Sequence, residues 1–158
     1  MVMKLDVLKV FLIGAMTLMC IGYESVRAAE VLDSGKFVTV DADHETTGTV
    51  EIVQKKNRIY VRLGDDFSTA EGPDLHLLLH KKNPPIGYDQ SDYVSLGRLK
   101  SFNGTQVFLV PDGVALDQYV SVVVWCKKFN IIFGTAHLER LAETFDVVNP
   151  GSALSYSR

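Results

Sequence analysis

Cys126 is the residue of this sequence whose type and setting point most directly to chemistry. It ends the apolar run Tyr119–Cys126 and is followed at once by Lys127 and Lys128. Positive charge close to a thiol favours the thiolate, which is the nucleophilic and metal-binding form of cysteine. The alternative is a buried cysteine that packs as a small hydrophobe and does not react. Residue chemistry alone leaves both interpretations open.

Histidines are the other side chains that could bind a metal or move a proton. His76 and His80 are four residues apart in the run Leu75–His80, where leucines recur with a period of two. A period of two indicates a strand, in which four residues span about 13 Å, too far for both rings to share one ion. The sequence therefore predicts no metal site, and a solvated polar face is the expected setting of these two histidines.

The first residues have the pattern of an export signal. Lys4 and Lys9 precede the uncharged apolar run Val10–Gly22, which is too short for a spanning helix of about 20 residues. Small residues at Val26 and Ala28 place a predicted cleavage site after Ala28. We therefore expect an exported protein, periplasmic or secreted to the cell surface, with no transmembrane segment in the mature chain.

Removal of residues 1–28 also removes Cys20 and leaves Cys126 as the only thiol of the mature chain. Exported proteins usually pair their cysteines, so a single one is inert, paired between molecules or chemically used. A lipid on Cys20 and a retained anchor are the alternatives to cleavage, although Met19 before the cysteine is a poor match to a lipidation motif.

Composition excludes several classes of protein. The chain has 158 residues, of which 47% are hydrophobic and 22% charged, enough apolar surface for one folded domain. The formal net charge of −3 gives no basic face for nucleic acid. Two cysteines are too few for a disulfide-stapled miniprotein.

The elements that must position Cys126 are short strands separated by turn residues. Among these residues, Lys55-Lys56-Asn57 predicts a polar turn within a hairpin, and Asn103-Gly104 predicts a tight turn. We expect about eight strands in one antiparallel β-sandwich or jelly-roll-like domain over residues 31–140, followed by a tail over 141–158. A short helix over His137–Glu143 is an alternative at the end of the domain. The expected strands are Phe37–Val40, Thr47–Val53, Arg58–Leu63, Leu75–His80, Tyr93–Gly97, Gln106–Val110, Tyr119–Cys126 and Asn130–Leu138.

Alternation along Tyr119–Cys126 predicts which way the thiol points. Cys126 shares one face of the strand with the valines at 122 and 124, whereas Trp125 lies on the other face. The all-valine side is the better candidate for the core. We therefore expect Cys126 to point inward at the end of the strand, near a rim of the sandwich.

An ordered series of short motifs resembles the DM-thirteen domain, a small all-β module of exported and cell-surface proteins. The resemblance covers about Gly35 to Leu138, and Phe108 stands where the family pattern leads us to expect a tyrosine. The motifs are Gly48-Thr49-Val50, Asp66-Phe67, Gly72-Pro73-Asp74-Leu75, Leu96-Gly97, Gly104-Thr105-Gln106-Val107-Phe108, Pro111, Tyr119–Cys126 and Phe129–Leu138.

The resemblance implies a role in electron transfer, with Cys126 as a naked thiol or as ligand to a prosthetic group such as haem. Trp125, Lys127 and Phe129 would shape the surroundings of the sulfur. A haem would need an apolar pocket at the rim and a histidine ligand, for which His76 is the candidate. Relatives often carry a cytochrome-like partner domain, so we expect a separate redox partner protein or cell-surface component here, and not a stand-alone enzyme.

Two other functions stay open. The chain could be a non-enzymatic binding or adhesion module, with Lys81–Asp92 and its prolines and tyrosines as the contact surface. A lipocalin-like barrel with a ligand at its mouth belongs to the same class. The third possibility is a stable scaffold in which the thiol of Cys126 only packs.

Overall fold

The structure is a computed structural model, and it describes residues 29–85 and 89–141. The expected export signal, nearly all of the expected tail and Tyr88 lie outside the described residues. Within the described part, no helix is long and apolar enough to cross a bilayer.

Strands make up nearly all the regular structure of the described residues. Two short 3-10 helices, η2 at Gln90–Asp92 and η3 at Leu116–Gln118, lie in connections. The expected all-β, antiparallel, single-domain fold is confirmed. The strands are β1 Glu30–Thr39, β2 Thr46–Thr47, β3 Thr49–Lys55, β4 Arg58–Leu63, β5 Ser68–Thr69, β6 Leu75–His80, β7 Tyr93–Arg98, β8 Gln106–Leu109, β9 Ser121–Cys126, β10 Ile131–His137 and β11 Glu139–Arg140.

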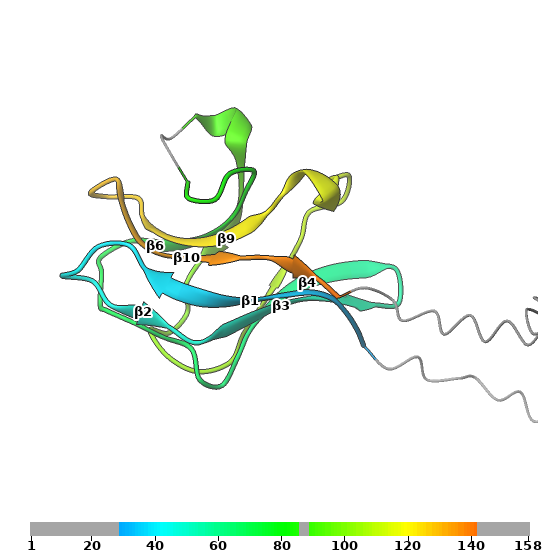
Figure 1. The fold of residues 1–158 in the computed structure, drawn as a ribbon, viewed down its shortest axis with the longest axis horizontal. Helices are drawn as coiled ribbons and strands as arrows, with labels where there is room; N and C mark the ends of the chain where they lie inside the picture. The colour runs from blue at the N-terminus through cyan, green and yellow to red at the C-terminus, as the bar shows by residue number, and fades with distance from the viewer. Residues whose placement is uncertain (1–28, 86–88, 142–158) are drawn as a thin grey trace, which may run out of the picture.

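One strongly curved sheet forms both layers of the molecule. Its strand order is β7-β6-β9-β10-β1-β3-β4-β8, with β11 added beside β1. The strand β1 joins the layers, because residues 30–36 pair with β3 and residues 37–39 pair with β10. Figure 1 shows β6, β9 and β10 stacked above β1, β3 and β4, so the sheet folds over itself like a nearly closed barrel.

The main core fills the space between the layers. Val50, Ile52 and Val61 from β3 and β4 have no exposed surface, and neither do Leu77 of β6 and Val124 of β9. Burial of one such side chain stabilises the fold by about 1.5–3 kcal/mol before entropy is counted. The alternating apolar residues of these strands therefore account for the curvature, since their inner faces must meet.

A second, smaller apolar cluster covers the outer face of β6 and β9. It contains Leu78, Val123 and Trp125, with the partly buried Tyr93 and Ile132 packed against it. The segment between β6 and β7, drawn in green at the top of Figure 1, projects from this side of the molecule. The main core covers one face of β9 and this cluster covers the other, so all six residues of β9 are buried. Strands buried on both faces carry continuous apolar runs, as β9 does.

Two turn predictions have different outcomes. The polar turn after β3 is confirmed: Lys55 pairs with Arg58, and Lys56 has the positive φ of 57° typical of a tight hairpin. The tight-turn signal at Asn103-Gly104 lies between β7 and β8, but these strands pair with β6 and β4 and not with each other. Short-range turn chemistry cannot distinguish a hairpin from a crossing between layers.

The end of the domain is extended. The helix considered over His137–Glu143 is wrong for its described part, because β10 continues to His137 and β11 pairs Glu139 with Ser34 of β1. Pairing with β1 gives the backbone of this segment hydrogen-bond partners that a single helical turn could not provide.

Candidate functional site

Cys126 lies in the main core, as the strand pattern predicts. Its side chain has 0% exposure, and it is the free cysteine of the described residues. Leu75 of β6 and Ile131 of β10 lie opposite it in the sheet. The inward direction is therefore confirmed. The sulfur is closed off from solvent although it ends its strand.

The residues expected to surround Cys126 separate into two groups. Lys127 and Phe129 are exposed in the turn between β9 and β10, where the Phe129 side chain is 59% exposed and Lys128 Nζ lies 5.5 Å from its ring. The backbone N–H of Lys127 donates to the Asp74 carbonyl at 2.9 Å. Trp125 points to the outer face of the sheet. The turn therefore offers an exposed aromatic and two cations beside the buried sulfur.

Cys126 and His76 do not come together. His76 pairs with Trp125, and Leu75 pairs with Cys126, so the two candidate ligands lie on opposite faces of the sheet. The sulfur packs within the apolar core, whereas haem ligation needs an apolar pocket open to the sulfur. The residues present therefore do not fit a haem held by Cys126 and His76.

Three of the surface hollows formed by residues 29–85 and 89–141 are well defined, and none of these three includes Cys126 in its lining. A hollow of about 450 Å³ lies beside Lys36, Glu51 and His137, and one of about 400 Å³ lies beside Tyr60 and Val107. A hollow of about 260 Å³ is lined by Leu75, whose strand pairs with that of the cysteine. Among residues 29–85 and 89–141, no three His, Cys, Asp or Glu side chains are grouped to hold a metal ion.

Aromatic rings form a continuous array on the outer face of β6, β7 and β9. The ring centroids of Tyr93 and Trp125 are 5.9 Å apart, and those of His76 and Trp125 are 6.3 Å apart. His80 stacks on Tyr93 at 6.5 Å with an interplanar angle of 14°. Contacts in this distance range are favourable for aromatic pairs. The four rings therefore form a row of neighbours along β6, in the order His76, Trp125, Tyr93 and His80.

One end of the array reaches charged groups at the surface. His76 Nε2 lies 2.9 Å from Asp74 Oδ1, and Arg98 Nε lies 3.7 Å from the same oxygen. The carboxylate of Asp74 therefore lies between two cationic or hydrogen-bonding partners, and it fixes the orientation of the His76 ring against Trp125.

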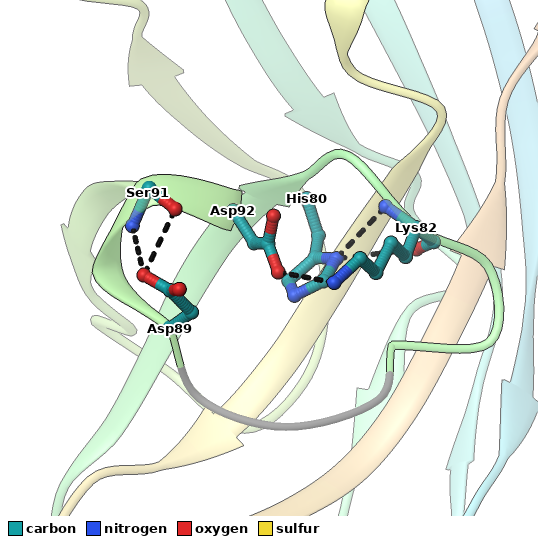
Figure 2. Close-up of polar contacts among 5 residues, drawn as sticks. All are labelled: His80, Lys82, Asp89, Ser91 and Asp92. Atoms are coloured by element: carbon teal, nitrogen blue, oxygen red, sulfur yellow. Dashed lines mark hydrogen bonds and ion pairs between the residues drawn. The ribbon is translucent and has the colours of Figure 1, made fainter.

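His80, at the other end, is buried instead of solvated. Its side chain is 2% exposed, and its Nδ1 accepts a hydrogen bond of 3.0 Å from the backbone N–H of Lys82 (Figure 2). The Lys82 carbonyl accepts from Ser121 Oγ at 2.8 Å. Burial lowers the pKa of His80, while the contact with the Lys82 backbone and the charge of Asp92 oppose that change. The neutral ring therefore anchors the start of the segment between β6 and β7.

Charged groups hold the two ends of this segment together. Lys82 Nζ lies 2.5 Å from Asp92 Oδ2 (Figure 2). The backbone N–H of Lys81 donates to the Asp92 carbonyl at 2.8 Å. Asp89 accepts from the backbone N–H and the hydroxyl of Ser91, and these bonds lower the pKa of Asp89. The described residues of the expected binding loop therefore hold its two ends together, and a binding role for this loop stays a prediction.

Sequence reasoning missed His80, Tyr93 and Ser121 as members of one buried arrangement. A signal for it was present in β9, which carries Val123 and Trp125 on the face opposite the valines of the core. Apolar residues on both faces indicate a strand covered on both sides. The sequence did not reveal that Tyr93 of β7 and Ile132 of β10 pack against this face.

Fold and site together define a class: within the described residues, the chain is an antiparallel β-module with a sealed thiol on one face of β9 and an aromatic array on the other. A comparison with protein families matches residues 36–138 to the family described as Electron transfer DM13. The chain belongs to this family, as the resemblance of its motifs led us to expect. Comparisons with curated proteins and with solved structures gave no match.

Proposed function

We propose that this chain is an exported electron-transfer module in which Cys126 is the redox centre. The family match over residues 36–138 carries the electron-transfer role. The assignment of Cys126 as the redox centre is supported by its free thiol, the one found among the described residues. Export rests on the signal-like residues 1–28, with the periplasm, the extracellular space or the cell surface as destination.

The burial of the sulfur limits how the reaction proceeds. Thiol–disulfide exchange requires direct contact between sulfurs, and a side chain with 0% exposure cannot make that contact while the sheet is closed. Electrons must therefore reach Cys126 through the protein. Loss of one electron from the thiol to an external acceptor is accompanied by loss of its proton, for which the exposed turn after Cys126 is the adjoining solvated region.

A separate redox protein is the proposed partner, and the turn between β9 and β10 is its proposed contact. Phe129 is exposed there beside Lys127 and Lys128. Exposed aromatic side chains are enriched where proteins associate, and cationic side chains steer an acidic partner toward the surface that carries them. A partner bound at this turn would lie at the end of β9 closest to Cys126.

Electron exchange with soluble one-electron mediators tests the proposal. We expect the purified full chain to exchange electrons with the mediators, and the Cys126→Ala variant to lose this exchange. Val124→Ala, which removes a buried side chain on the same face of β9, is the matched control and should keep it. The proposal is wrong if the unmodified chain exchanges no electrons, or if Cys126→Ala exchanges them equally well.

A further inference from the structure

We infer that Tyr93 and Trp125 form a one-electron relay across the outer face of β7 and β9, supported by the His76–Asp74 pair. This inference rests on the proposed electron-transfer function and deepens it by naming a route. Trp125 directly precedes Cys126 in β9, so a covalent backbone path joins the relay to the proposed redox centre.

Distance is the first argument for the relay. The rings of Tyr93 and Trp125 are 5.9 Å apart and tilted by 51°, with no side chain needed to bridge them. Indole and phenol side chains can each lose one electron and be restored. Two of them in contact allow an electron to move in short steps instead of one long step.

Burial is the second argument. Trp125 is 8% exposed and packs with Leu78 and Val123, which shields an oxidised indole from water. Tyr93 is only half-buried at the edge strand β7. The relay therefore runs from a protected ring toward one that can release a proton to solvent.

Polar groups around the indole provide the third argument. The Trp125 Nε1–H donates to Asn130 Oδ1 at 3.2 Å, so an acceptor faces the N–H that becomes acidic when the ring is oxidised. The His76 ring meets the indole at 6.3 Å and is hydrogen-bonded to the Asp74 carboxylate. The Asp74 carboxylate, bonded to the ring that contacts the indole, places negative charge near Trp125 and favours the positive, oxidised indole.

The electron balance is simple. A high-potential one-electron metal complex takes an electron from Trp125, which becomes an indole radical cation while its N–H stays bonded to Asn130. Tyr93 then gives one electron to Trp125 and releases its phenol proton to water. The products are a neutral Tyr93 radical, a restored Trp125, one proton and the acceptor reduced by one electron.

Flash photolysis with a ruthenium trisbipyridine oxidant tests this route. Trp125 is the one tryptophan of the sequence, so an indole radical signal has a single source. In the full chain we expect the indole radical to decay as a tyrosyl radical rises. In Tyr93→Phe we expect the indole radical to persist and the matching tyrosyl rise to disappear. Tyr60→Phe, on β4, is the control and should behave like the unmodified chain.

Two outcomes would overturn the relay. One is a tyrosyl rise in Tyr93→Phe that matches the unmodified chain. The other is an indole radical that decays in the unmodified chain without any tyrosyl signal. Neither depends on Cys126, so the mediator experiment with Cys126→Ala can succeed while the relay fails. Loss of mediator exchange in Cys126→Ala together with normal exchange in Trp125→Phe would show a redox cysteine served by another route.

Discussion

At the scale of single residues, opposite faces of one strand separate the sulfur from the aromatic rings. Cys126 points into the main core, and Trp125 points outward, where it packs with Leu78 and Val123 and against Tyr93. The pairing of Trp125 with His76, and of Cys126 with Leu75, keeps the two sets apart. A group that must act on the sulfur therefore has to come through the core or the turn, and one that acts on the indole comes from the outside.

His80 gives a residue-scale prediction about pH. Its pKa is lowered from the ordinary value of 6.5, chiefly by burial, so the unfolded chain binds the His80 proton more readily than the folded chain. The stability that depends on neutral His80 is complete above pH 6.5 and is lost as the pH falls through the lowered pKa. Urea denaturation from pH 7.5 downward should show this loss.

His80→Asn is the matched variant for this measurement. Its short amide can still accept from the Lys82 N–H but does not titrate. We expect the variant to be less stable at neutral pH, because the stacking on Tyr93 is lost, and to have a shallower decline below pH 6.5. Equal slopes for the two proteins would show that His80 is not the titrating group.

At the scale of elements, close backbone approach between strands determines which glycines are essential. Gly48 joins β2 to β3 with φ of 105°, and its carbonyl accepts from the Phe37 N–H at 2.8 Å. A Cβ at this position would lie 2.4 Å from Phe67 Cα. Gly104 also has a positive φ, of 76°, but a Cβ there would meet nothing within 4 Å.

These two glycines give the second prediction. Gly104→Ala should cost about 1–2 kcal/mol, the penalty of a left-handed backbone for a residue with a side chain. Gly48→Ala should cost clearly more, because the backbone at Phe67 must also move. Urea denaturation of both variants gives the comparison, and equal losses would mean that the crowding at Phe67 is relieved without cost.

At the scale of the whole molecule, β1 connects the two layers into one cooperative unit. Glu30, Val31 and Ser34 pair with β3, and Ser34 also pairs with β11, whereas the second part of β1 pairs with β10. The family match begins at residue 36, after this first part of the strand. The structural unit of this chain therefore starts earlier than the matched segment.

Fragment stability gives the third prediction. A fragment over residues 29–141 keeps every described strand and should unfold in one cooperative transition. A fragment over residues 37–141 loses the first part of β1, and with it hydrogen bonds to β3 and β11, so it should be much less stable or unfolded. Circular dichroism during heating distinguishes the two, and equal midpoints would show that residues 29–36 add nothing to the fold.

Sequence and tertiary structure contributed different parts of this description. Period-two alternation was sufficient to predict most strands and the inward direction of Cys126. In a strand, the position of a residue in the local sequence determines which face its side chain lies on. Turn residues were sufficient to predict the hairpin at Lys56. The motifs were sufficient to identify the family, since they occur in order along nearly the whole matched segment.

Only the tertiary structure showed that Cys126 is sealed, that His76 lies on the other side of the sheet from it, and that Tyr93, Trp125 and His80 meet. These facts depend on which strands become neighbours and on where the segment after β6 lies. Strand neighbours are chosen by contacts between residues far apart in the chain, and such contacts leave no local pattern in the sequence. Burial of the sulfur and assembly of the aromatic array are therefore products of sheet closure.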